Sequence, residues 1–66
     1  MKNNIKVERA IKNLTQEELA KKVSVTRQTI NAMEANKYVP STVRALKIAK
    51  GFDKKVEDIF MLEKTD

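Results

Sequence analysis

The sequence predicts one all-α domain of five short helices. Its 66 residues suffice for one domain and no more. Signals that begin and end helices recur at short intervals, and a single Gly and a single Pro leave few breaks between them. The chain has no Cys, so disulfides cannot stabilise its thin core. Packed helices, self-association or both must do so.

The first helix is expected near the N-terminus. Asn4 is suited to the N-cap, and the helix should run to about Lys12. Asn13 then suits the left-handed turn that commonly ends a helix. A second helix is therefore expected to begin soon after residue 13.

Two independent signals place the start of that second helix. Thr15 and Glu18 form a capping box, and Leu14 and Leu19 flank the cap as a hydrophobic staple. The helix is expected over Gln16–Val23. Its inner face should hold Leu19, Ala20 and Val23, and its outer face should pair Glu17 with Lys21 and Glu18 with Lys22.

The third helix repeats the same arrangement almost at once. Thr26 is its predicted N-cap, with Val25 and Ile30 as the staple. The helix should cover about Arg27–Ala35, with Ile30 and Met33 facing inward. The second and third helices are then separated by a turn of about three residues.

The remaining elements are a fourth and a fifth helix. Asn36 suits a left-handed end to the third helix, and Ser41 should cap a fourth that reaches about Lys50. The fourth helix should be buried in part through Val43, Leu46, Ile48 and Ala49. A short last helix is expected from Val56 to Ile59 or Phe60. Residues 60–64 then either pair as a short strand with residues 2–4 or trail from the domain.

The composition argues against an enzyme. The chain has no His and no Cys, the usual residues of acid–base and nucleophilic catalysis and the usual ligands of zinc or haem. It has no Gly-rich phosphate loop and is too short to form a pocket. We therefore expect no catalytic residue, metal, cofactor or small-molecule ligand.

The charge is divided unevenly along the chain. Residues 1–50 hold 11 basic and 4 acidic side chains, a net charge of +7, whereas residues 51–66 hold 3 basic and 5 acidic ones, a net charge of −2. A basic body with an acidic tail indicates one surface directed at a polyanion.

Residues 16–35 have the pattern of a helix-turn-helix, whose second helix can enter the major groove of DNA. Arg27 could donate two hydrogen bonds to guanine, and Gln28 could pair with adenine. Thr26, Thr29 and Asn31 have a suitable size to reach a base or the backbone. Gln16, at the start of the first helix of the pair, could hold a phosphate oxygen.

The run TQEELAKKVSVTRQTINAMEANKYVPS, followed by ALKIA and VEDIF, resembles the helix-turn-helix repressors of the phage Cro and repressor type, also called the XRE family. The resemblance covers about residues 4–62 and is strongest to short single-domain bacterial and archaeal members. It implies a five-helix, lambda-repressor-like fold, binding to double-stranded operator DNA as a homodimer, and regulation of transcription, most often repression. With no apolar run able to span a membrane, the expected location is the cytoplasm, in association with the nucleoid.

The resemblance also implies residue roles. Base contacts fall on Thr26, Arg27, Gln28 and Asn31, and backbone contacts on Gln16, Asn36, Lys37, Tyr38 and Ser41. Thr29, by its size and chemistry, is also expected to contact the backbone. Arg9 and Glu34 match a structural ion pair between the first and third helices.

The chain departs from the family pattern at several positions. Ser24 stands where the turn usually has Gly, and must either adopt a left-handed conformation or alter the turn. Glu8 stands where relatives often have Leu, which leaves the rotation of the first helix open. Asp53 and Lys55 replace a frequent Gly and a frequent Ser cap before the last helix.

One recognition helix reads about four base pairs, too few to select a site in a genome, so a two-fold dimer is expected. We place its interface in residues 51–66, through Phe52, Val56, Ile59, Phe60 and Leu62, although these residues could instead complete the core of one chain. The alternative function is a protein-interaction or antitoxin-like module that uses the same fold.

Overall fold

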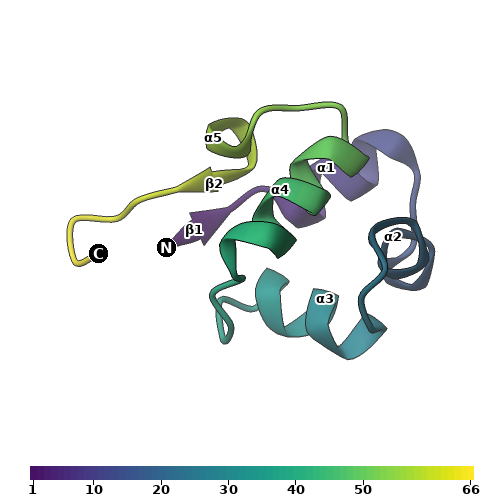
Figure 1. Ribbon diagram of the computed structural model, residues 1–66, viewed down its shortest axis with the longest axis horizontal. Coiled ribbons are helices and arrows are strands. Elements are labelled where there is room, and N and C mark those ends of the chain that lie inside the picture. Colours follow the sequence, from purple (N-terminus) through teal and green to yellow (C-terminus); the bar gives the residue numbers. More distant parts are fainter.

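Five helices and one two-stranded antiparallel sheet form the computed structural model, which describes residues 1–66 (Figure 1). The all-α prediction is confirmed, and the termini form the short strand pair that the sequence left open as one alternative. In chain order the elements are β1 (Lys2–Asn3), α1 (Ile5–Lys12), α2 (Gln16–Val23), α3 (Arg27–Glu34), α4 (Thr42–Gly51), α5 (Val56–Ile59) and β2 (Phe60–Met61).

The core lies where the helices meet, and α4 occupies the middle of the molecule. In Figure 1, α4 lies between α3 and the pair formed by α5 and the sheet. Eleven apolar residues are buried, and every helix contributes at least one. They are Ile5, Leu19, Ala20, Val23, Ile30, Met33, Ile48, Ala49, Phe52, Ile59 and Phe60.

The start of α1 corrects one predicted cap. Asn4 is at the N-cap position, but its side chain accepts no capping hydrogen bond. The amide oxygen of Asn3 instead accepts from the backbone N–H of Ile5 at 3.2 Å. Asn4 is held elsewhere, because its backbone N–H donates to the carbonyl of Ile59 at 2.8 Å. The left-handed end at Asn13 is confirmed, with a φ of 56°.

The predictions for α2 and α3 hold closely. Thr15 and Glu18 form the capping box, and the Thr26 hydroxyl caps α3 by accepting from the N–H of Thr29. Ser24 and Asn36 both adopt the left-handed conformation, with φ of 60°. Ser24 therefore reproduces the turn that Gly would form, and α3 ends one residue earlier than predicted, at Glu34.

The prediction that α4 buries Val43 and Leu46 is wrong. Their exposed fractions are 61% and 54%. The inward face of α4 is set by Ala45, Ile48, Ala49 and Phe52, which recur at the three- and four-residue spacing of one helix side. Val43 and Leu46 lie outside that spacing and form an apolar strip on the surface.

The C-terminal segment completes the core of one chain. Phe52, Ile59 and Phe60 are exposed by only 1%, 0% and 7%. The expectation that they form a dimer face is corrected for these three residues, because they pack against the buried residues of their own chain. Val56 is half-buried and Leu62 is exposed.

The strand alternative for the termini is confirmed. Lys2 pairs with Met61 and Asn3 with Phe60 in antiparallel register, so the strand is two residues long. Asp53 adopts the left-handed conformation before α5, with a φ of 55°. The carboxylate of Asp58 accepts from the backbone N–H of Lys55 at 3.2 Å and so caps the first turn. No helix in the structure combines the length and apolar character needed to cross a bilayer.

Candidate nucleic-acid interface

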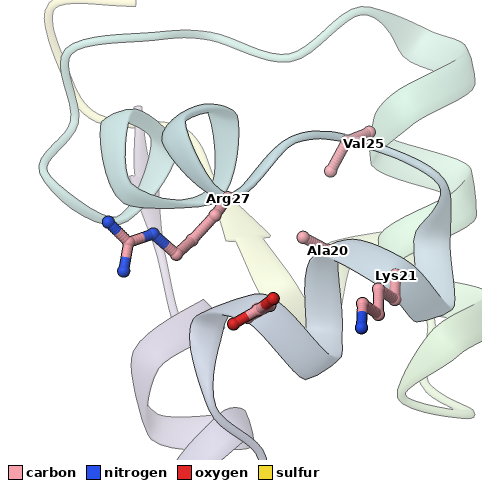
Figure 2. A pocket seen from close by; sticks show the side chains of 5 residues that line it. Ala20, Lys21, Val25 and Arg27 are labelled. Carbon is pink, nitrogen blue, oxygen red and sulfur yellow. The ribbon is translucent and has the colours of Figure 1, made fainter.

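The turn between α2 and α3 fixes the angle of the two helices. The backbone N–H of Val25 donates to the carbonyl of Ala20 at 3.0 Å, and Figure 2 shows the Val25 side chain pointing toward Ala20. The guanidinium of Arg27 extends away from both (Figure 2). Small Ala20 is buried at this junction, where a longer side chain would separate the helices.

The outer side of α3 presents three of the four predicted base-contact residues together. Arg27, Gln28 and Asn31 are exposed, and together with Ala32 and Lys37 they line one shallow hollow of about 200 Å³. The long side chains of Arg27 and Gln28 lie in the first turn of α3. In a helix that enters the major groove, the first turn is the part that contacts base edges. The hollow therefore brings hydrogen-bond donors, acceptors and positive charge onto one surface.

The two threonines of this region are already engaged. The hydroxyl of Thr26 accepts from the backbone N–H of Thr29 at 3.1 Å and lies 2.8 Å from the hydroxyl of Thr29. Thr29 is half-buried. Both side chains thus stabilise the first turn of α3, and their remaining hydrogen-bonding capacity is smaller than that of the exposed side chains.

The Arg9–Glu34 pair is present with bidentate geometry. The Nε and Nη2 atoms of Arg9 donate to the carboxylate of Glu34 at 2.7 and 3.1 Å. The two side chains are exposed by only 16% and 7%. Burial works against the charge of Glu34, yet hydrogen bonds from Arg9 and Gln16 outweigh it and hold the pKa of this carboxyl below its usual value. The pair joins α1 to the last turn of α3.

Gln16 connects this ion pair to Asn31 on the outer side of α3. Its amide nitrogen donates to Glu34 at 3.1 Å, and its amide oxygen accepts from the side-chain nitrogen of Asn31 at 3.5 Å. Sequence reasoning gave Gln16 a phosphate contact and did not find this connection. Nothing in local spacing signals it, because the residues lie 15 and 18 positions from Gln16.

The loop after α3 places its predicted contact residues unevenly. Lys37 is exposed and lines the hollow beside α3. The side-chain oxygen of Asn36 accepts from Asn3 at 3.2 Å, and the Ser41 hydroxyl caps α4 by accepting from the N–H of Arg44 at 3.2 Å. Lys37 is therefore the loop side chain with the freest approach to a ligand.

Tyr38 packs in the loop and engages Arg44. A guanidinium N–H of Arg44 donates to the hydroxyl of Tyr38, and the guanidinium carbon lies 5.7 Å from the ring centre. The hydrogen bond and the cation–π contact hold Arg44 in place and leave further N–H groups for an anion.

The lysines on the outer face of α2 do not form the predicted pairs. The structure contains no ion pair within 4 Å between Glu17 and Lys21 or between Glu18 and Lys22. Glu18 closes the capping box, and its oxygen accepts from the backbone N–H of Thr15 at 2.8 Å. That hydrogen bond lowers the pKa of Glu18. The positive charge of the lysines is therefore not neutralised by close contacts.

Comparisons with known proteins find matches over most of the chain. The family model described as Helix-turn-helix matches residues 5–59. An uncharacterized HTH-type transcriptional regulator of Methanocaldococcus jannaschii is 60% identical over 63 residues, which are 96% of each chain. The uncharacterized HTH-type transcriptional regulator YgzD of Bacillus subtilis is 52% identical over 63 residues, again 96% of each chain. One from Archaeoglobus fulgidus is 50% identical over all of this chain and 93% of its own.

Proposed function

Since the chain belongs to the XRE-type helix-turn-helix family of DNA-binding transcriptional regulators, we propose that it recognises a palindromic operator as a homodimer and represses transcription there. The observation that carries the proposal is the exposed outer side of α3. Arg27, Gln28 and Asn31 line one hollow there, on a helix fixed from behind by buried Ile30 and Met33. These side chains are suited to read base edges in the major groove.

The proposed reading divides between bases and backbone. Arg27 donates to guanine O6 and N7, Gln28 pairs with adenine, and each contact discriminates by about 1–3 kcal/mol against a wrong base. Lys37 and Gln16 contact phosphates on either side of the groove and set the register of α3. Because phosphate contacts release counterions, binding weakens steeply as salt rises.

We infer the homodimer from the number of base pairs that one copy of α3 can contact. One copy of α3 reads too few base pairs, whereas two copies about 34 Å apart read two successive half-sites. The longest dimension of one chain is 31 Å, which is close to that spacing.

We place the dimer surface on α4 and α5 and not on the buried aromatic residues. Leu46 and Val56 line a hollow of about 810 Å³ between these helices, and Val43 is exposed on the same helix as Leu46. Side chains of both signs, including Lys50 and Glu57, surround the hollow. In a two-fold contact the lysines of one copy can face the acidic side chains of the other, and the apolar strip is covered.

Repression requires only occupancy. A dimer that covers two half-sites in a promoter excludes the polymerase, whereas activation also needs a surface that binds the polymerase. Repression is therefore the simpler outcome of tight, specific binding.

The proposal is tested by selecting bound duplexes from a random pool with the full chain. The expected result is an inverted repeat with half-site centres about 10 base pairs apart. Recovery of unrelated sequences from the pool would contradict sequence reading. It would favour the protein-interaction module as the function instead.

A further inference from the structure

We propose that Gln16 is a specificity-determining positioning residue. It links the Arg9–Glu34 ion pair to Asn31 and thereby fixes which edge of the Asn31 amide faces a base. This inference rests on the proposed function, since it concerns how the same surface distinguishes one base pair from another. It assigns Gln16 a role beyond the phosphate contact.

The first step is the anchor. Glu34 is charged and held by Arg9 from one side, with hydrogen bonds of 2.7 and 3.1 Å. A carboxylate accepts and cannot donate, so the end of Gln16 that faces it must be the NH₂ group. The orientation of the Gln16 amide is therefore determined by chemistry, and its oxygen points to the other side.

The second step passes that orientation to Asn31. The oxygen of Gln16 can only accept, so the group of Asn31 that faces it must also be the NH₂. One N–H of Asn31 is then engaged, while its second N–H and its oxygen remain for a ligand. Without Gln16 the side-chain amide of Asn31 could flip and exchange its donor and acceptor, because the two orientations would then have about the same energy.

The retained donor and acceptor match adenine. In the major groove adenine presents the N7 acceptor beside the N6 amino donor, and an asparagine amide in a fixed orientation pairs with both. The Asn31–Gln16 hydrogen bond is the longest in the chain of contacts, at 3.5 Å. We therefore expect Gln16 to tune the preference at one base pair and not to create the whole specificity.

A phosphate contact and a positioning role have different consequences. Loss of a phosphate contact weakens binding to all sequences about equally, because phosphates carry no sequence information. Loss of positioning removes discrimination at one base pair, the one that Asn31 faces. The two readings are therefore separable without knowing the operator in advance.

The experiment uses Gln16→Met, which keeps the length of the side chain and removes both hydrogen bonds. Affinities are measured for the best duplex and for its single-base-pair variants, with Asn31→Ala and the double variant alongside. Lys37→Met serves as the control for a phosphate contact. Thermal unfolding of each variant shows that it remains folded.

The proposal predicts a loss of preference of about fivefold for Gln16→Met at the base pair where Asn31→Ala also loses preference, and no further loss in the double variant. Lys37→Met should weaken all duplexes alike. Equal weakening of all duplexes by Gln16→Met would overturn the proposal, as would a loss at a different base pair from that of Asn31→Ala.

A second measurement needs no DNA. The side-chain amide resonances of Asn31 in a ¹⁵N spectrum should shift and exchange faster with solvent in Gln16→Met, and stay unchanged in Lys64→Met, a substitution in the exposed C-terminal tail. Unchanged resonances in Gln16→Met would refute the link itself. Shifted resonances in a protein that binds all duplexes equally would support the link, but would refute both the proposed function and the specificity role of Gln16.

Discussion

Arg9 and Glu34 meet across the molecule in a bidentate ion pair, with hydrogen bonds of 2.7 and 3.1 Å that join α1 to the end of α3. Because both side chains are largely buried, removing one partner leaves the other without its main contact. Arg9 also donates to the carbonyl of Leu14 at 2.8 Å, so the pair stabilises the connection between α1 and α2 as well.

Glu34→Gln should lower the free energy of unfolding by about 1–3 kcal/mol, because the charge-assisted hydrogen bonds to Arg9 are lost at a largely buried site. Urea denaturation measures the change. Glu17→Gln, at an exposed position on α2 without an ion pair, is the matched control and should change stability little. Equal stability of Glu34→Gln and the wild type would show that the pair contributes nothing.

The same carboxyl predicts how stability depends on pH. The pKa of Glu34 is lowered from 4.5 in the folded state, so its contribution is present above about pH 4.5 and is lost as the pH falls through the lower folded pKa. Wild-type stability should therefore fall more steeply on acidification than that of Glu34→Gln. Chemical denaturation at a series of pH values checks this, and parallel curves for the two proteins would contradict it.

Gly51 ends α4 against α2. A Cβ atom at this position would lie 2.8 Å from Cγ1 of Val23, a buried β-branched side chain with little rotamer freedom. Gly51→Ala should therefore reduce stability by about 1 kcal/mol, although alanine is the better helix former. Thermal unfolding tests the sign. In a Val23→Ala background the same substitution should become stabilising, and a loss in both backgrounds would rule out this contact as the cause.

Leu46→Glu should prevent dimer formation and leave the fold intact, because Leu46 is exposed in one chain and covered only in the proposed dimer. Sedimentation equilibrium should show a monomer, and affinity for a two-half-site duplex should fall by about 100-fold or more as the linkage between half-sites is lost. Ile11→Glu, at an exposed apolar residue of α1, is the control and should remain a dimer. A Leu46→Glu dimer of wild-type strength would place the interface elsewhere.

Local chemistry made much of the fold predictable. Thr15, Thr26 and Ser41 start their helices as predicted, and Asn13 and Ser24 end theirs in the left-handed conformation. Such caps depend on side chains within a few residues, so spacing in the sequence is sufficient to find them.

What depends on packing between elements was not predictable in the same way. Val43 and Leu46 are apolar at helical spacing, and only the positions of α2 and α5 decide which side of α4 is buried. Phe52 and Phe60 fit a core and an interface equally well by sequence. The contacts of Gln16 with Glu34 and Asn31 join the first turn of α2 to the last turn of α3 and have no sequence signature.

Base reading by α3 is tested most directly by two affinities of the wild type, one for its selected duplex and one for a scrambled duplex, in one buffer of defined salt. Both measurements are repeated with Arg27→Ala/Gln28→Ala. Lys64→Ala, which removes one positive charge from the exposed C-terminal tail, is the control. The wild type should prefer the selected duplex by about 10³-fold or more. The double variant should lose most of this preference while remaining folded, and the control should keep it. A wild type that binds both duplexes with similar affinity, or a double variant that keeps the full preference, would contradict base reading by α3.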